Sequence, residues 1–274
     1  MDRKPTDDSN QLARLRLEPT RNGNRHEMAT SSRIEWTEQT WNPTTGCTKI
    51  SPGCKHCYVE TMAKRLQGMG APGYDNGFRL SLMKDRLEQP LRRCKPTVYF
   101  VNSMSDLFHE DIPDEFLDRV FSIIEETPRH TYQILTKRST RLRRYFSEQA
   151  APRNAWLGVS VENRQNGIPR IDDLRAINST VRFISAEPLL EDLGEIDLRG
   201  IHWMIAGGES GPKARPMKAE WVENIHRQCR HSGISFFFKQ WGRWGADGKQ
   251  RAKKANGRLF NGRVWDEMPL SPLV

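Results

Sequence analysis

The chain has 274 residues, and 43 Lys and Arg against 34 Asp and Glu give it a formal net charge of +9 at pH 7. Hydrophobic residues make up 36%, which is typical of a foldable polar protein and excludes a wholly disordered chain. No apolar run reaches the roughly 18 residues of a membrane helix, and the first residues lack the apolar core of a signal peptide. We therefore expect no membrane contact and a cytoplasmic location. The positive charge favours an anionic partner such as nucleic acid or a nucleotide, and a merely solvating basic surface fits it equally well.

Short apolar runs alternate with helix-compatible stretches from residue 33 onward. The predicted strands are residues 33–37, 97–102, 132–136, 156–161, 182–185, 202–206 and 235–238, and the predicted helices are 57–67, 114–125, 164–177 and 218–231. This alternation predicts a parallel α/β sheet, either curled into a full or partial barrel or left open.

The same pattern divides the chain into three parts. Residues 1–32 are polar and show no sustained apolar period, so we expect a disordered N-terminal extension. Residues 33–241 form the predicted α/β domain. In the remainder, 242–274, the stretch 242–262 is rich in Gly, Lys and Arg and predicts a basic flap, and a short C-terminal anchor follows it. We expect the flap to order over the mouth of the barrel when substrate binds.

Polar side chains follow six of the predicted strands at the point where each strand ends. They occupy residues 102–106, 136–138, 160–163, 185–188, 207–211 and 239–241. The carboxyl ends of parallel strands form the active sites of such folds, and charged groups there are costly to bury unless they are paired or used. We therefore predict a site at this rim, with Lys137, Glu187 and Lys239 as candidate catalytic residues.

Three of the five cysteines lie close together, at Cys47, Cys54 and Cys57, with the spacing Cys-x6-Cys-x2-Cys. In a reducing compartment such a group indicates metal binding or catalysis rather than a disulfide. Three thiolates on one loop suit an iron–sulfur cluster whose fourth iron stays open to a small chelating ligand such as S-adenosylmethionine. A zinc site with His56 or Cys94 as fourth ligand and a set of three free thiols are the alternatives.

Further short motifs lie between residues 33 and 269. They are IEWT (34–37), WNPTTGC (41–47), NSMSDLFH (102–109), LTKR (135–138), GVSVEN (158–163), GGESG (207–211), FFKQWG (237–242) and WDE (265–267). Together with the cysteines they resemble the phage- and prophage-associated three-Cys-motif family of the radical S-adenosylmethionine superfamily. The resemblance implies a partial (β/α)6-type barrel, a [4Fe-4S] cluster on Cys47, Cys54 and Cys57, and cleavage of S-adenosylmethionine to a 5′-deoxyadenosyl radical.

The chain departs from the common superfamily pattern in two respects. The first gap between cysteines is longer than in Cys-x3-Cys-x2-Cys, and the Gly-Gly-Glu sequence that usually follows the second strand here follows the sixth run. The resemblance implies three groups of contacts to S-adenosylmethionine. Ser103, Ser105 and Asp106 are expected to bind its amine, with Asn102 next to them. Ser160, Glu162 and Asn163 are expected at the ribose or the methionine carboxylate, and Gly207, Gly208 and Glu209 near the adenosine or the substrate.

The expected substrate follows from the charge and from the resemblance. A basic flap and a phage-associated family together predict an isomerase that rearranges a modified thymine during DNA hypermodification. The alternatives are a radical enzyme acting on RNA, a free nucleotide or a protein, a zinc-stabilised nucleic-acid-binding module without turnover, and a lyase acting on DNA photolesions. The resemblance also implies an external electron donor of the flavodoxin or ferredoxin type, in the cytoplasm of a bacterium or phage-infected host.

Overall fold

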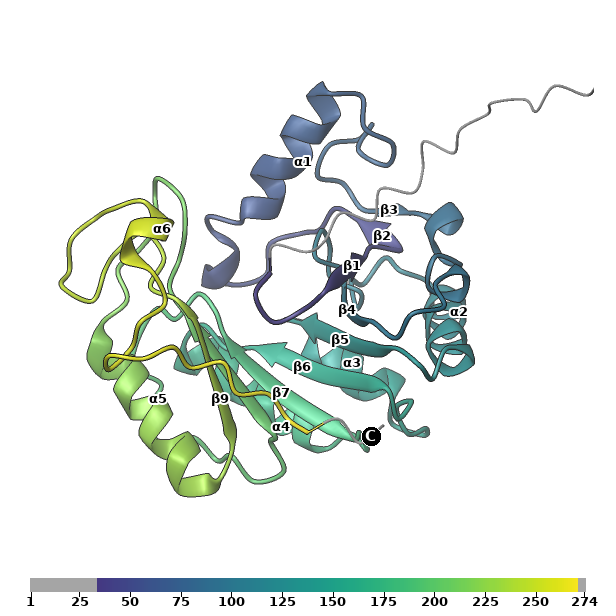
Figure 1. Cartoon of the computed structure of the whole chain (residues 1–274). Helices are drawn as coiled ribbons and strands as arrows, with labels where there is room; N and C mark the ends of the chain where they lie inside the picture. Colours follow the sequence, from purple (N-terminus) through teal and green to yellow (C-terminus); the bar gives the residue numbers. More distant parts are fainter. Residues whose placement is uncertain (1–33, 271–274) are drawn as a thin grey trace, which may run out of the picture. The chain divides into compact units, whose positions relative to one another are not determined.

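The structure is a computed structural model that describes residues 34–270 (Figure 1). The predicted disordered extension, residues 1–32, lies outside the described residues, as do residues 271–274. Within the described range, every helix is too short or too polar to span a bilayer.

Seven parallel strands form the main sheet, and their order in space is their order in the chain. The strands are β1 (Gln39–Trp41), β4 (Val98–Val101), β5 (Thr131–Thr136), β6 (Ala155–Ser160), β7 (Val181–Ala186), β8 (Trp203–Gly207) and β9 (Ser235–Gln240). The sheet curls into a half-barrel with β1 and β9 as its edges (Figure 1). The predicted partial barrel of parallel strands is therefore confirmed. A separate antiparallel pair joins β2 (Thr44–Thr45) to β3 (Ser81–Leu82).

The first predicted strand, at residues 33–37, is wrong. The backbone N–H of Thr37 donates to the carbonyl of Ile34 and closes a turn, so the strand begins only at Gln39. Trp36, which belongs to the short apolar run that predicted a strand, is instead 3% exposed and packs edge-on against Phe100. A short apolar run does not distinguish a strand from a turn whose large side chain inserts into the core.

The four predicted helices form within two residues of their expected bounds. The structure has two further helices that the sequence did not predict. The observed helices are α1 (Tyr58–Gly68), α2 (Asp114–Glu126), α3 (Ser139–Tyr145), α4 (Arg164–Arg175), α5 (Ala219–Ser232) and α6 (Lys253–Asn256), with 3-10 turns η1 (Pro52–Cys54), η2 (Lys84–Arg86) and η3 (Pro90–Arg92). Helix α3 was missed because its sequence, STRLRRY, has one aliphatic residue and no apolar period. Helix α5 ends at Gly233, which adopts the left-handed conformation (φ 67°) that favours glycine.

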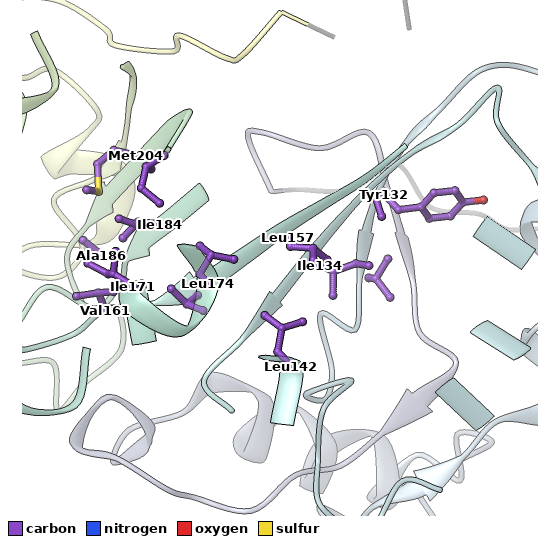
Figure 2. Packing of buried hydrophobic residues seen from close by; sticks show 14 of the residues in the cluster. Tyr132, Ile134, Leu142, Leu157, Val161, Ile171, Leu174, Ile184, Ala186 and Met204 are labelled. Carbon is purple, nitrogen blue, oxygen red and sulfur yellow. The ribbon is translucent and has the colours of Figure 1, made fainter. Parts of the chain in front are cut away.

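The two faces of the sheet have separate cores. Helices cover one face, where Leu142 of α3 and Leu174 of α4 belong to the same buried cluster as Leu157 of β6 (Figure 2). The opposite face carries a second cluster that we call the aromatic plug, made of Trp36, Phe100, Trp156, Val181, Phe183, Trp203, Ile205 and Phe237. Successive side chains of a strand point to opposite faces, so both faces of these strands are apolar.

Trp203 lies at the middle of the aromatic plug. Its ring centroid is 5.5 Å from that of Phe183, 5.9 Å from that of Trp36 and 6.0 Å from that of Phe237. Gly158 of β6 makes room for this arrangement, because a Cβ there would lie 2.4 Å from the ring of Phe183. The plug fills one end of the half-barrel with rings rather than leaving a channel.

The C-terminal segment covers the free edge of β9. Asp266 pairs antiparallel with Phe237, and the backbone N–H of Phe238 donates to the carbonyl of Trp265 at 2.9 Å. Before it, the segment 242–262 contains α6, whose Lys253 Nζ lies 3.4 Å from Glu35 Oε1. Residues that follow the last strand therefore contact residues that precede the first.

Replacing Trp203 by alanine should lower the free energy of unfolding by about 3–5 kcal/mol, since the fully buried ring would leave a large cavity. Urea unfolding followed by circular dichroism measures the loss. Trp221→Ala, at a half-buried tryptophan of α5, is the matched control and should cost clearly less. Equal losses in the two variants would contradict the central place of Trp203.

Candidate active site at the carboxyl ends of the strands

A cavity of about 480 Å³ opens at the carboxyl ends of the parallel strands. Trp36, Phe100 and Leu135 supply apolar surface to it, and the polar strand ends supply the rest. The predicted site residues that line it are Cys47, Cys54, Cys57, Asn102, Ser103, Ser105, Asp106, Lys137, Ser160, Glu187, Gly208, Glu209 and Lys239. Residues separated by almost two hundred positions thus face one space, because parallel strands end on the same side of a sheet.

Three predicted cofactor contacts do not line the cavity. Glu162 is fully buried, and its Oε2 accepts from Arg170 Nη1 at 2.7 Å. Asn163 caps α4 by accepting from the backbone N–H of Asn166 at 3.0 Å. Gly207 lies behind Glu187, where a Cβ would come within 2.5 Å of Oε1. Each of these residues supports the wall of the cavity instead of facing it.

The Asp106 carboxylate links the ends of two neighbouring strands. Its Oδ1 accepts from Thr136 Oγ1 at 2.6 Å and from the backbone N–H of Phe108 at 3.0 Å. Its Oδ2 accepts from the backbone N–H of Lys137 at 3.0 Å and from Arg138 Nη1 at 3.1 Å. Each oxygen already accepts two hydrogen bonds, so the carboxylate holds the loop after β4 against the end of β5.

The hydroxyl and amide groups of residues 102–105 also have partners. Asn102 Nδ2 donates to Thr44 Oγ1 at 2.8 Å, and the same threonine hydroxyl donates to Ser105 Oγ at 2.9 Å. Ser103 Oγ donates to Asn42 Oδ1 at 3.2 Å. This network ties the loop after β4 to the segment that leads into the cysteine loop.

The three cysteines are half-buried free thiols on one loop that borders the cavity. Cys54 ends η1, and Cys57 is the N-terminal cap of α1. The loop begins at Gly46 (φ 79°), where a Cβ would lie 2.0 Å from the carbonyl oxygen of Arg79, so only glycine permits this close approach. The loop is therefore held at its start by backbone packing and at its end by a helix.

The thiols fit an iron–sulfur cluster by their chemistry and their placement. Burial and the charge of Asp106 raise the pKa of Cys47 to about 11, although Arg138 lowers it, so the free thiol stays protonated at neutral pH and a metal would have to displace its proton. Between residues 34 and 270, no three His, Cys, Asp or Glu side chains converge on a point that could hold one metal ion. A cluster does not require such a point, because each of its cysteines binds a different iron.

The three predicted catalytic residues differ in their surroundings. Lys239 Nζ forms an ion pair with Glu187 Oε1 at 3.3 Å and lies 5.9 Å from the centroid of the Trp36 ring. Ser185 Oγ donates to the other oxygen of Glu187 at 3.1 Å. The ammonium group of Lys137 forms no ion pair or hydrogen bond with the described part of the chain, and it lines the cavity.

Sequence reasoning missed Arg215, which links two loops of the site. Arg215 binds the carboxylate of Glu209 with two nitrogens, Nη2 to Oε1 at 2.7 Å and Nε to Oε2 at 2.9 Å. Its Nη1 donates to the carbonyl of Pro52 in the cysteine loop at 3.0 Å. Burial alone would raise the pKa of Glu209, and the hydrogen bonds and charge of Arg215 outweigh it and lower the pKa. No local signal marks Arg215 among the other basic residues of its loop.

Comparison with known proteins identifies the family. Residues 31–269 match a family model described as a protein of unknown function (DUF5131). The chain belongs to this family. No curated protein matches the DUF5131 chain.

Solved structures that resemble the DUF5131 chain include spore photoproduct lyases. One substituted lyase is 11% identical with a TM-score of 0.49, and the match covers 77% of this chain and 78% of that one. A lyase with dinucleoside spore photoproduct has a TM-score of 0.44 and a substituted lyase that also binds AdoMet has 0.43, each at 13% identity over 72% of this chain and 62% of the other. The DUF5131 chain thus spans about three fifths of the length of these two relatives. Identities this low transfer no activity.

Arg215→Met should lower the free energy of unfolding by about 2–4 kcal/mol at pH 7, because it leaves the buried Glu209 carboxylate with the backbone N–H of residue 215 but without the guanidinium. Since the folded-state pKa of Glu209 is lowered, the pair stabilises fully above the ordinary value of 4.5, and its contribution is lost as pH falls through the folded-state pKa.

The loss of unfolding free energy caused by Arg215→Met should therefore become smaller below about pH 4.5. Urea unfolding at a series of pH values measures it. Glu209→Gln supplies the control, because in that background Arg215→Met should cost much less. A loss that is independent of pH and of Glu209 would show that Arg215 acts through other contacts.

Proposed function

We propose that this DUF5131 protein is a radical S-adenosylmethionine enzyme with a [4Fe-4S] cluster on Cys47, Cys54 and Cys57. One observation carries the proposal: three thiols of a single loop line the same cavity as the polar ends of six parallel strands. Three protein ligands leave one iron of the cluster open to a small chelating molecule. When bound, the cluster and S-adenosylmethionine supply a carbon radical, with the electron coming from an external donor of the flavodoxin or ferredoxin type.

The chain's own residues prepare the cavity for the cofactor. Ser103, Ser105 and Ser160 offer hydroxyls to the polar groups of S-adenosylmethionine. Gly208, where a Cβ would lie 2.0 Å from the carbonyl oxygen of Trp241, lets the loop after β8 pack against the backbone after β9 at the edge of the cavity. Asp106, with all its acceptor positions in use, fixes the loop that carries Ser103 and Ser105.

We propose a nucleobase with an amino-acid-like substituent as the substrate, a modified thymine in DNA. Lys239 and Glu187 offer one cation and one anion 3.3 Å apart, which suits a substituent carrying both a carboxylate and an amine. The free ammonium of Lys137 adds a second cation, and Trp36 and Phe100 give an apolar surface for a planar base. Isomerisation fits this set, because it changes bonding within the substrate and needs no further co-reactant.

The residues at the rim of the cavity favour a nucleobase within a polymer, rather than a free nucleotide, as the substrate. Tyr58 is 59% exposed, yet its hydroxyl donates to the carbonyl of Ser103 at 3.0 Å, so the ring is held in place at the lip. A base must leave its stack to reach an enclosed site, and exposed aromatic rings beside cations stabilise unstacked strands. Lys253 and Lys137 line the same cavity and supply the positive charge.

Anaerobic reconstitution with iron and sulfide should load about four irons per chain and give a brown protein that releases 5′-deoxyadenosine from S-adenosylmethionine on reduction. Cys54→Ala should lose the cluster and the release. Cys94→Ala, at an exposed cysteine away from the cavity, is the matched control and should keep both. A colourless wild-type protein with bound zinc and no cleavage would refute the proposal.

Tyr58→Ala should weaken binding of a single-stranded DNA oligonucleotide by about 1–3 kcal/mol, because it removes the stacking surface at the lip. Tyr58→Phe keeps the ring and should retain most of the affinity. Fluorescence anisotropy with a labelled oligonucleotide measures both. If the alanine and phenylalanine variants bind equally well, the polymer does not contact Tyr58, and a free nucleotide becomes the better substrate.

A further inference from the structure

Arg138 lies against the cysteine loop at the end of β5. The residue is 5% exposed, and its Nη1 donates to Cys47 Sγ at 3.5 Å. Its Nη2 donates to the backbone carbonyl of Thr48 at 3.2 Å and to the hydroxyl of the same residue at 2.8 Å. A buried cation thus contacts the first of the three cysteines and the residue that follows it.

Two carboxylates hold this guanidinium in place. Nη1 also donates to Asp106 Oδ2 at 3.1 Å, and Nε donates to Glu110 Oε2 at 2.8 Å. With the two bonds to Thr48 and the bond to Cys47, all five N–H hydrogens of the guanidinium have acceptors. The geometry of the Arg138–Cys47 contact is therefore set from several sides.

A hydrogen bond to a ligand sulfur has a known effect on an iron–sulfur cluster. The reduced cluster carries one more negative charge than the oxidised cluster, so an N–H donor or a nearby cation stabilises the reduced form more. A nearby carboxylate has the opposite effect. Burial strengthens both effects, because little water screens the charges.

We propose that Arg138 is a positioning residue that sets the reduction potential of the cluster through Cys47. Its N–H and its charge raise the potential, while Asp106 limits the rise. This inference rests on the proposed function, since it requires a cluster on the three cysteines. It assigns Asp106 a role in tuning the cluster through Arg138, beyond its link between two strands.

The proposal predicts shifts of opposite sign for the two partners. Arg138→Gln removes the cation and leaves the charge of the Asp106 carboxylate near the sulfur uncompensated, so the midpoint potential should become more negative. Asp106→Asn removes an anion beside the guanidinium, so the potential should become more positive. Glu110 is 61% exposed on its side chain, and Glu110→Gln should give a smaller positive shift because solvent screens its charge.

The experiment uses the full chain reconstituted anaerobically, without S-adenosylmethionine. Iron content is measured first, and the reduced cluster is then followed by electron paramagnetic resonance during a reductive titration. Arg138→Lys should return part of the potential lost in Arg138→Gln, because it restores the charge without the forked donors. If the glutamine variant does not fold, the potential of the lysine variant is compared with that of the wild type instead.

Arg141→Gln is the matched control. Arg141 is a second buried arginine three residues along, and it donates to the carbonyls of His109 and Ile112 and to Asp114 rather than to the cysteine loop. Its replacement should lower stability without moving the potential. A general loosening of the region would move the potential in this variant as well.

The possible outcomes distinguish a failure of this inference from a failure of the proposed function. A loaded wild-type protein with an unshifted potential in Arg138→Gln, or with the same sign of shift in Arg138→Gln and Asp106→Asn, overturns the inference alone. A wild-type protein that takes up no iron overturns the proposed function and the inference with it. Opposite shifts at normal iron content, with Arg141→Gln unmoved, support the assignment.

Discussion

The candidate site depends on the buried carboxylate of Asp106, which accepts four hydrogen bonds from the ends of β4 and β5. A buried carboxylate is stable only when its oxygens have donors, so the four bonds determine where the two strand ends lie. One of the donors, Arg138, extends the link to the cysteine loop through Cys47 and Thr48. Strand ends, cysteine loop and cavity wall are thereby part of one hydrogen-bonded unit.

The half-barrel separates its inner face into an apolar end and a polar end. The aromatic plug around Trp203 fills the first, and the cavity with its ion pairs occupies the second. Trp36 belongs to both, since it packs in the plug and also lies beneath Lys239 at the cavity. Burying charges above a rigid aromatic layer keeps them in a region of weak screening, where Glu187 and Lys239 interact strongly with each other and with any ligand.

Much of the fold could be predicted because strands buried on both faces read as continuous apolar runs, such as the run that becomes β6. The polar residues that follow these runs predicted the position of the cavity, because the carboxyl ends of parallel strands meet at one edge of the sheet. Burial direction was not predictable: the apolar residues Tyr58, Met62 and Leu66 recur every four positions in α1, yet Val59 and Ala63 are its buried residues. Nor could the sequence separate Glu162, which turns beneath the rim, from Glu187, which faces the cavity. The partners Arg138 and Arg215 meet the cysteine loop only through the tertiary fold.

The order of the strands has a consequence for how the protein is made. Because spatial order follows chain order, the sheet can grow strand by strand as the chain leaves the ribosome. The cysteine loop emerges early, but Arg138 follows Cys47 by 91 residues and Arg215 follows Pro52 by 163. The loop therefore gains the first of these arginines only after β5 and the second only after β8 has been synthesised. For the proposed cluster, iron delivered before that point would meet an unsupported loop, whereas iron delivered after it would meet a loop held by both arginines.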